Sequence, residues 1–179
     1  MIGVDIFLRR NSEHLVQRWN LNAPFRLARY EFARSRYDLI NSRFLTSGID
    51  GSRWPSYVRD LFDRLEGGGW LQMTEAYMNI QSDSGRRDEA PNIGRWWELY
   101  STALEIQGKD PRAGTIVTNV RRRAWTSLAT LMEETGFIGI ETDQPQLPIG
   151  SWSTGERNTH STKWYTKTDI QTQMPMLEW

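Results

Sequence analysis

Three segments of this chain have apolar residues at helical spacing, and each is followed by glycine, a residue that commonly ends a helix. In the segment that begins at Pro55, apolar side chains recur three and four residues apart, which places them on one face of a helix. Glycine directly after the last helical residue is a common helix end. The pattern predicts three helices, each with its stop: 55–66 before Gly67–Gly69, 92–107 before Gly108, and 115–134 before Gly136.

Two more helices are expected nearer the start of the chain. A short one covers residues 13–19, and a long one runs from Pro24 to about residue 45, because proline is favoured in the first helical turn. Residues 70–80 also have helical apolar spacing, although a strand that begins at Trp70 is an alternative after three glycines. The helices 13–19, 24–45, 55–66, 92–107 and 115–134 give a fold with about five helices.

Strands are expected at residues 2–8, where apolar and other side chains alternate, and at residues 137–141. We expect the two to pair, because a lone strand leaves its backbone groups unsatisfied. The predicted fold class is therefore α+β and mostly helical, on a small sheet. A C-terminal hairpin within residues 145–179 is an optional third part of that sheet, and an extended arm that orders on a partner is the alternative. Residues 1–144 are predicted to form a single globular domain.

The composition excludes several classes of protein. The chain has 179 residues with 22 basic and 22 acidic side chains, so its formal net charge is zero, and it has no cysteine. Disulfide frameworks, thiol nucleophiles and cysteine-ligated metals are thereby excluded. No apolar run approaches the roughly 18 residues of a membrane helix, and the first residues lack the features of a signal peptide. We expect a cytoplasmic protein with no membrane partner.

A row of arginines in the predicted helix 24–45 is the most specific feature. Arg29, Arg36 and Arg43 recur every seven residues between two apolar strips, with Phe32 and Tyr37 beside them. Burying unpaired guanidinium groups is costly, so each needs a carboxylate, a carbonyl, solvent or a ligand anion. One interpretation is that the heads reach solvent or pair within the chain. The other is a groove that binds a phosphate or carboxylate, with Phe32 or Tyr37 stacked on a base.

Searches for catalytic patterns find little. The chain has two histidines and no nucleophile-elbow, zinc-protease or phosphate-loop motif, so no catalytic residue, metal or cofactor is predicted. Asp5 is the best single candidate, because a carboxylate on an apolar strand is similar to the first metal ligand of ribonuclease-H-like nucleases. The alternative for Asp5 is a polar partner for an arginine or a backbone amide.

Two segments resemble one protein family. The opening Gly3-Val4-Asp5-Ile6-Phe7-Leu8 and the later Gly69-Trp70-Leu71-Gln72-Met73-Thr74-Glu75-Ala76-Tyr77 are similar to segments of a family of small, functionally uncharacterised bacterial and phage proteins. Those proteins have His-Gly after the second segment, where this chain has Met78 and Asn79. The resemblance implies a bacterial or phage origin and one recurrent acidic site formed by Asp5, Glu75 and Tyr77.

Three functions follow from these features. The leading one is a non-enzymatic phage or bacterial binding protein whose arginine and aromatic groove recognises a nucleotide, a nucleic acid or an acidic protein surface. The second is a structural or assembly protein that docks on neighbouring subunits or a virion through residues 145–179. The third is a metal-dependent phosphoesterase or nuclease that uses Asp5 and Glu75.

Overall fold

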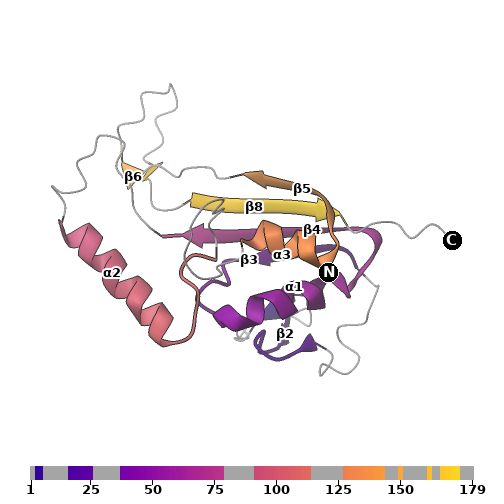
Figure 1. Ribbon diagram of the computed structural model, residues 1–179, viewed down its shortest axis with the longest axis horizontal. Helices are drawn as coiled ribbons and strands as arrows, with labels where there is room; N and C mark the ends of the chain where they lie inside the picture. The colour runs from indigo at the N-terminus through magenta and orange to yellow at the C-terminus, as the bar shows by residue number, and fades with distance from the viewer. Residues whose placement is uncertain are drawn as a thin grey trace.

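The computed structural model describes residues 3–5, 16–25, 37–78, 91–113, 127–143, 149–150, 161–162 and 166–173, and side chains within 19–25, 37–78, 91–113 and 127–143. A four-stranded sheet is its centre (Figure 1). In spatial order its strands are β3 (Tyr37–Arg43), β4 (Leu65–Tyr77), β8 (Thr166–Gln173) and β5 (Ile138–Asp143). Strands β3 and β4 are parallel, whereas β8 is antiparallel to both β4 and β5.

Two smaller sheets accompany the central one. Strands β1 (Gly3–Asp5) and β2 (Val16–Arg18) pair in parallel, with Asp5 opposite Arg18. Strands β6 (Ile149–Gly150) and β7 (Ser161–Thr162) pair antiparallel.

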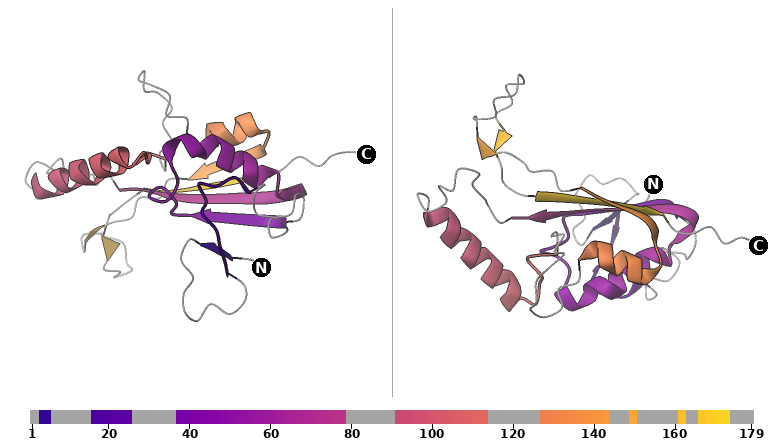
Figure 2. Two further views of the ribbon diagram at one scale, coloured as in Figure 1. Left: turned by 90° about the horizontal axis from the view of Figure 1, so that it is seen from below. Right: turned by 45° about the horizontal axis from the view of Figure 1, so that its top comes forward.

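Three α-helices lie within the described residues. They are α1 (Trp54–Phe62), which follows a short 3-10 turn at Gly51–Arg53, α2 (Pro91–Ile106) and α3 (Leu128–Thr135). Helices α1 and α3 lie side by side on one face of the sheet, and α2 lies beyond the end of β4 (Figures 1 and 2). No described helix is long and apolar enough to cross a bilayer.

The hydrophobic core fills the space between these two helices and the sheet. Val58 of α1, Met132 of α3, and Leu71 and Met73 of β4 are fully buried there. The opposite sheet face presents Leu39, Trp70 and Ile138, which are 61%, 46% and 51% exposed. Leu39 is paired with Trp70, and Trp70 and Ile138 are both paired with the same residue of β8. The three therefore form one apolar row across the open face.

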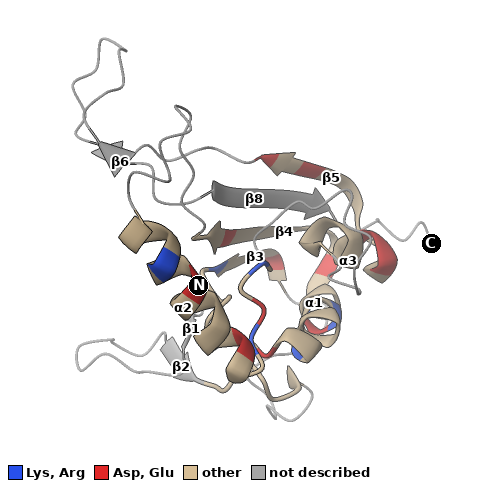
Figure 3. Cartoon of the chain, turned by 60° about the vertical axis from the view of Figure 1, so that its left-hand side comes forward, with Lys and Arg blue, Asp and Glu red and all other residues tan. Residues whose placement is uncertain are grey.

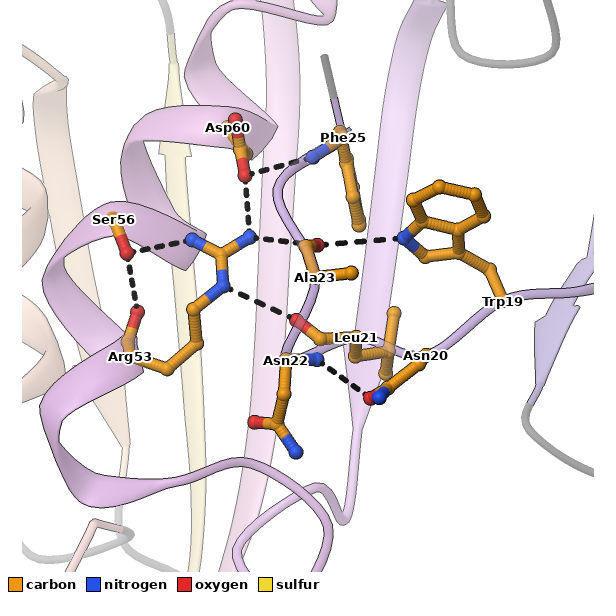
Figure 4. Close-up of polar contacts among 9 residues, drawn as sticks. All are labelled: Trp19, Asn20, Leu21, Asn22, Ala23, Phe25, Arg53, Ser56 and Asp60. Carbon is orange, nitrogen blue, oxygen red and sulfur yellow. Dashed lines mark hydrogen bonds and ion pairs between the residues drawn. The ribbon is translucent and has the colours of Figure 1, made fainter. Parts of the chain in front are cut away.

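The segment before β3 is fastened to α1 by Arg53 (Figure 4). The Arg53 guanidinium donates to the carbonyls of Leu21 (3.2 Å) and Ala23 (3.3 Å), and it pairs with the Asp60 carboxylate. The same Asp60 oxygen accepts the backbone N–H of Phe25 at 3.2 Å. Arg53 is 8% exposed, so a buried charge is satisfied here by fixed acceptors.

The prediction of about five helices is wrong. The long helix 24–45 fails because residues 37–43 form strand β3, and the short helix 13–19 fails because residues 16–18 form β2. Extended pairing with β4 satisfies every second backbone group of β3, which the helical apolar spacing of residues 33–44 did not reveal. The predicted pairing of the first strand with residues 137–141 is also wrong, since β1 pairs with β2 and β5 pairs with β8.

The prediction that Gly67–Gly69 ends a helix is also wrong. Helix α1 ends at Phe62, and Gly67–Gly69 lie inside β4. Between Tyr37 and Leu39 of β3 the register skips from Leu65 to Trp70 of β4, so the glycines form a bulge with a φ of 84° at Gly68. A Cβ at Gly69 would lie 3.0 Å from the Tyr37 carbonyl oxygen, so only glycine fits without a shift there.

Other predictions are confirmed. Helix α1 begins next to Pro55, α2 matches the predicted helix 92–107, and α3 matches the last part of the predicted helix 115–134. Gly136 ends α3 with a φ of 110°, as a left-handed cap. Strand β5 matches the predicted strand 137–141, and β4 matches the strand alternative at Trp70.

Candidate functional site

The carboxyl ends of β3 and β4 lie at the same edge of the sheet, because the two strands are parallel. Helix α2 stands beyond this edge (Figure 1). In sheets with parallel strands, ligands bind in the crevice outside the carboxyl ends of the strands. The residues at this edge are 43–46, at and after the end of β3, and 75–77, at the end of β4.

Phe44, the first residue after β3, has a backbone that non-glycine residues seldom adopt. Its φ is 53°, in the left-handed region, which costs an L-residue with a Cβ about 1–2 kcal/mol. The Phe44 N–H donates to the Thr74 carbonyl at 2.8 Å, and its side chain is 54% exposed. A large apolar ring is thus held at the edge by a strained backbone, and such strain is concentrated at functional sites.

The buried carboxylate of Glu75 holds the strained turn. Its Oε1 accepts the Leu45 N–H at 2.9 Å, and its Oε2 accepts both the N–H (2.9 Å) and the hydroxyl (2.7 Å) of Thr46. Glu75 is fully buried, and this burial raises its pKa, whereas the hydrogen bonds from Thr46 and Leu45 oppose the rise. Both carboxylate oxygens thus accept hydrogen bonds from the turn, and the role of Glu75 here is to hold the backbone of Leu45 and Thr46 in place.

Aromatic rings join β4 to α2 at the same edge. The ring of Tyr77, the last residue of β4, packs edge-on against Trp97 of α2, with 5.4 Å between the ring centroids. Trp97 also contacts Tyr100 at 6.0 Å, and Tyr100 stacks on Trp96 at 5.3 Å with their planes 7° apart. We call Tyr77, Trp96, Trp97 and Tyr100 the ring cluster. Trp96 is 40% exposed, so part of the cluster faces solvent.

Acidic residues outnumber basic residues on the described elements (Figure 3). Arg43 turns back along its strand, because its Nε donates to the Asn41 side chain at 2.7 Å. Among the described residues, no group of three histidine, aspartate or glutamate side chains could hold a metal ion. The edge therefore offers aromatic surface near a carboxylate that is already occupied.

Only two residues of the predicted arginine groove, Tyr37 and Arg43, lie within the described residues. Arg29, Phe32 and Arg36 lie outside the described residues. Tyr37 and Arg43 are the two end residues of strand β3. Arg43 is therefore not part of a helical row of arginines spaced seven residues apart.

The predicted acidic site falls on two sheets. Asp5 is the last residue of β1, in the small parallel sheet, whereas Glu75 and Tyr77 are in β4 of the central sheet. Glu75 and Tyr77 do lie at the candidate edge. Sequence reasoning missed Phe44 and Trp97, although Trp97 was included among the apolar residues of the predicted helix 92–107. The positive φ of a phenylalanine leaves no sequence signal, because glycine or asparagine is the usual residue there.

No protein-family profile matches the chain. Curated relatives do match it. Methyltransferase pytC of Aspergillus terreus is 26% identical over 121 residues, which cover 66% of this chain and 33% of that protein. Secondary metabolism regulator laeA of Aspergillus fumigatus is 23% identical over 168 residues, which cover 92% of this chain and 41% of that protein. The chain thus spans about a third to two fifths of the length of these relatives.

A solved structure matches the fold. A SAM-dependent methyltransferase from Archaeoglobus fulgidus superimposes with a TM-score of 0.54 and 10% identity, over 96% of this chain and 75% of that one. The fold is similar to that of a methyltransferase. The identity is low, so this likeness concerns the arrangement of the strands and helices.

These findings overturn four predictions from the sequence. The relatives are fungal methyltransferases and regulators, so the resemblance to small bacterial and phage proteins was wrong. The non-enzymatic binding protein, the assembly protein and the metal-dependent nuclease do not agree with them either. The inclination against an enzyme is wrong, because relatives such as pytC are methyltransferases. The mostly helical fold is replaced by a methyltransferase-like sheet with three described helices.

Proposed function

We propose that this chain takes part in methyl transfer from S-adenosylmethionine. The observation that carries the proposal is an agreement between two independent comparisons: sequence relatives that are methyltransferases, and a solved methyltransferase with the same fold over 96% of the chain. S-adenosylmethionine supplies an electrophilic methyl group on a positively charged sulfonium. The residues at the carboxyl edge have to bind this molecule and orient the group that accepts the methyl.

The chemistry of the residues at hand fits such a ligand. The aromatic faces of Phe44 and Tyr77 suit a cation or a flat heterocycle, since aromatic faces attract cations and stack on planar rings. The two rings therefore offer the aromatic contacts that suit an adenosine sulfonium.

Each element then has a defined task. The Glu75 carboxylate keeps the turn from Phe44 to Thr46 in place, so that the Phe44 ring does not reorient when a ligand arrives. Helix α2 is attached to the end of β4 through the contact of Trp97 with Tyr77, and it adds the ring cluster to this edge. Pre-organised contacts of this kind lower the cost of ordering the site on binding.

Calorimetric titration of the purified chain tests the proposal, with S-adenosylmethionine and S-adenosylhomocysteine as ligands and NAD as the control. We expect both adenosyl compounds to bind and to raise the melting temperature, because a ligand at 100 times its Kd stabilises a protein by about 2.7 kcal/mol. NAD contains the adenosine and lacks the amino-acid part, so it should bind more weakly. Absence of binding by both adenosyl compounds would overturn the proposed function.

A further inference from the structure

The Phe44 ring is exposed although its backbone is strained. The side chain is 54% exposed, so burying it gives only part of the stabilisation available to a core phenylalanine. The left-handed φ of 53° costs conformational free energy in the native state, and glycine would adopt this φ without that cost. The fold nevertheless assigns a fully buried carboxylate and three hydrogen bonds to the two residues that follow. The arrangement therefore keeps the ring at this edge at the expense of stability.

The surroundings of the ring determine what it can recognise. The Glu75 carboxylate contacts the turn directly, and both of its oxygens already accept hydrogen bonds. The neighbouring Arg43 guanidinium is held to Asn41, back along β3. A positively charged ligand that reaches this turn therefore meets the exposed ring of Phe44, and the Glu75 carboxylate is not free to bind it. The ring cluster at the end of β4 adds further π surface at the same edge.

We propose that Phe44 contacts the sulfonium of S-adenosylmethionine and so allows the site to distinguish this cation from its neutral product, S-adenosylhomocysteine. The inference rests on the proposed function and adds to it a residue that discriminates substrate from product. The two ligands differ by one methyl group and one positive charge. A cation over an aromatic face gains attraction that the neutral thioether does not. The consequence is tighter binding of the substrate and easier release of the product.

The test compares the Kd values of the two ligands in Phe44→Leu and in the unchanged chain. Leucine keeps the apolar bulk and removes the π face. We expect S-adenosylmethionine affinity to fall by about 3- to 20-fold, the range for a cation–π contact, and S-adenosylhomocysteine affinity to change by less than about twofold. Phe44→Trp keeps a π face and should retain the preference for the cation.

Trp70→Leu is the matched control, because Trp70 is another half-exposed ring of the same sheet and lies seven residues before the end of β4. It should leave both Kd values unchanged. Circular dichroism and melting temperature show whether each variant is folded, and Phe44→Trp supplies the readout if Phe44→Leu is not.

The outcomes separate the inference from the proposed function. If the unchanged chain binds neither ligand, the proposed function fails and the inference fails with it. If it binds both, and Phe44→Leu weakens both equally or neither, the inference alone is overturned. The same holds if Phe44→Trp binds both ligands and shows no preference for the cation.

Discussion

Replacing Glu75 with glutamine tests how strongly the buried carboxylate holds the turn after β3. The amide has nearly the same size and shape, so no cavity opens. It has one acceptor oxygen in place of two, however, and its NH2 group must face one set of donors. If the amide oxygen stays beside Thr46, it keeps both Thr46 donors and the NH2 group faces the Leu45 N–H, which then loses its partner.

The expected loss is worked from these three bonds. A backbone donor left without a partner costs about 1–3 kcal/mol, and the two remaining bonds weaken because charge-assisted bonds are roughly twice as strong as neutral ones. Against this, glutamine removes the cost of burying an ionised carboxylate, a cost that is evident from the raised pKa of Glu75. We expect a net loss of about 1–3 kcal/mol in the free energy of unfolding at pH 7, or roughly 2–12 °C in Tm for a chain of this size.

The loss should depend on pH in a defined direction. Burial raises the pKa of Glu75 in the folded protein above its ordinary value, so between those two pKa values the folded state binds more protons than the unfolded state. The stability contributed by this proton is fully present below the ordinary glutamate pKa and is lost as the pH rises through the raised folded pKa. The unchanged chain should therefore gain stability relative to Glu75→Gln as the pH is lowered through this window.

Urea unfolding of both proteins at several pH values between 4 and 8 measures this difference. Thr46→Val is the matched variant, because it removes only the hydroxyl bond to Oε2 and should cost less, about 1 kcal/mol. If Glu75→Gln is as stable as the unchanged chain, and the difference is constant over the pH range, then the carboxylate does not hold this turn.

Three further predictions concern the rest of the fold. Arg53→Lys should cost about 2–4 kcal/mol in urea unfolding, since a single ammonium cannot reach the acceptors that the guanidinium spans; a loss below about 0.5 kcal/mol would contradict this. Gly69→Ala should lower the free energy of unfolding by about 1–3 kcal/mol, because its Cβ would lie 3.0 Å from two carbonyl oxygens. Gly48→Ala is the control: its Cβ would have its nearest atom at 3.5 Å, so the free energy of unfolding should change by less than about 0.5 kcal/mol. Equal effects of the two substitutions would refute the close approach at Gly69. Trp70→Ser should reduce the fluorescence of a bound hydrophobic dye and change stability by less than about 1 kcal/mol, and an undiminished dye signal would show that the apolar row does not form an accessible surface.

Helix prediction from the sequence succeeded where a stop signal and an apolar stripe agreed. Pro55 near the start of α1 and Gly136 at the end of α3 act by local backbone preferences, which the sequence displays directly. Strand β3 was mistaken for a helix because its exposure does not alternate cleanly: Leu39 is exposed on the open face and Ile40 is only half-buried on the other. Its partner β4 is distant in sequence, and long-range pairing overrides local spacing.

The site was predicted only in part. Glu75 and Tyr77 were selected as members of one site, and the structure places both at the carboxyl edge of β4. Their roles could not be inferred, because the donors to Glu75 come from Leu45 and Thr46, some 30 residues earlier. The location of Phe44 at the edge followed from the parallel pairing of β3 and β4, which became evident only with the fold.

Strand β8 also has a consequence for how the molecule reaches its native state. Among the described strands it is the last in sequence, yet it lies between β4 and β5 and pairs with both. During synthesis, Ile138–Asp143 must wait for residues 166–173 before it can join the central sheet at all. The four-stranded sheet is thus complete only after residues 166–173 have been synthesised, and a nascent chain that pauses before this point carries an unpaired β4 edge that other chains can contact.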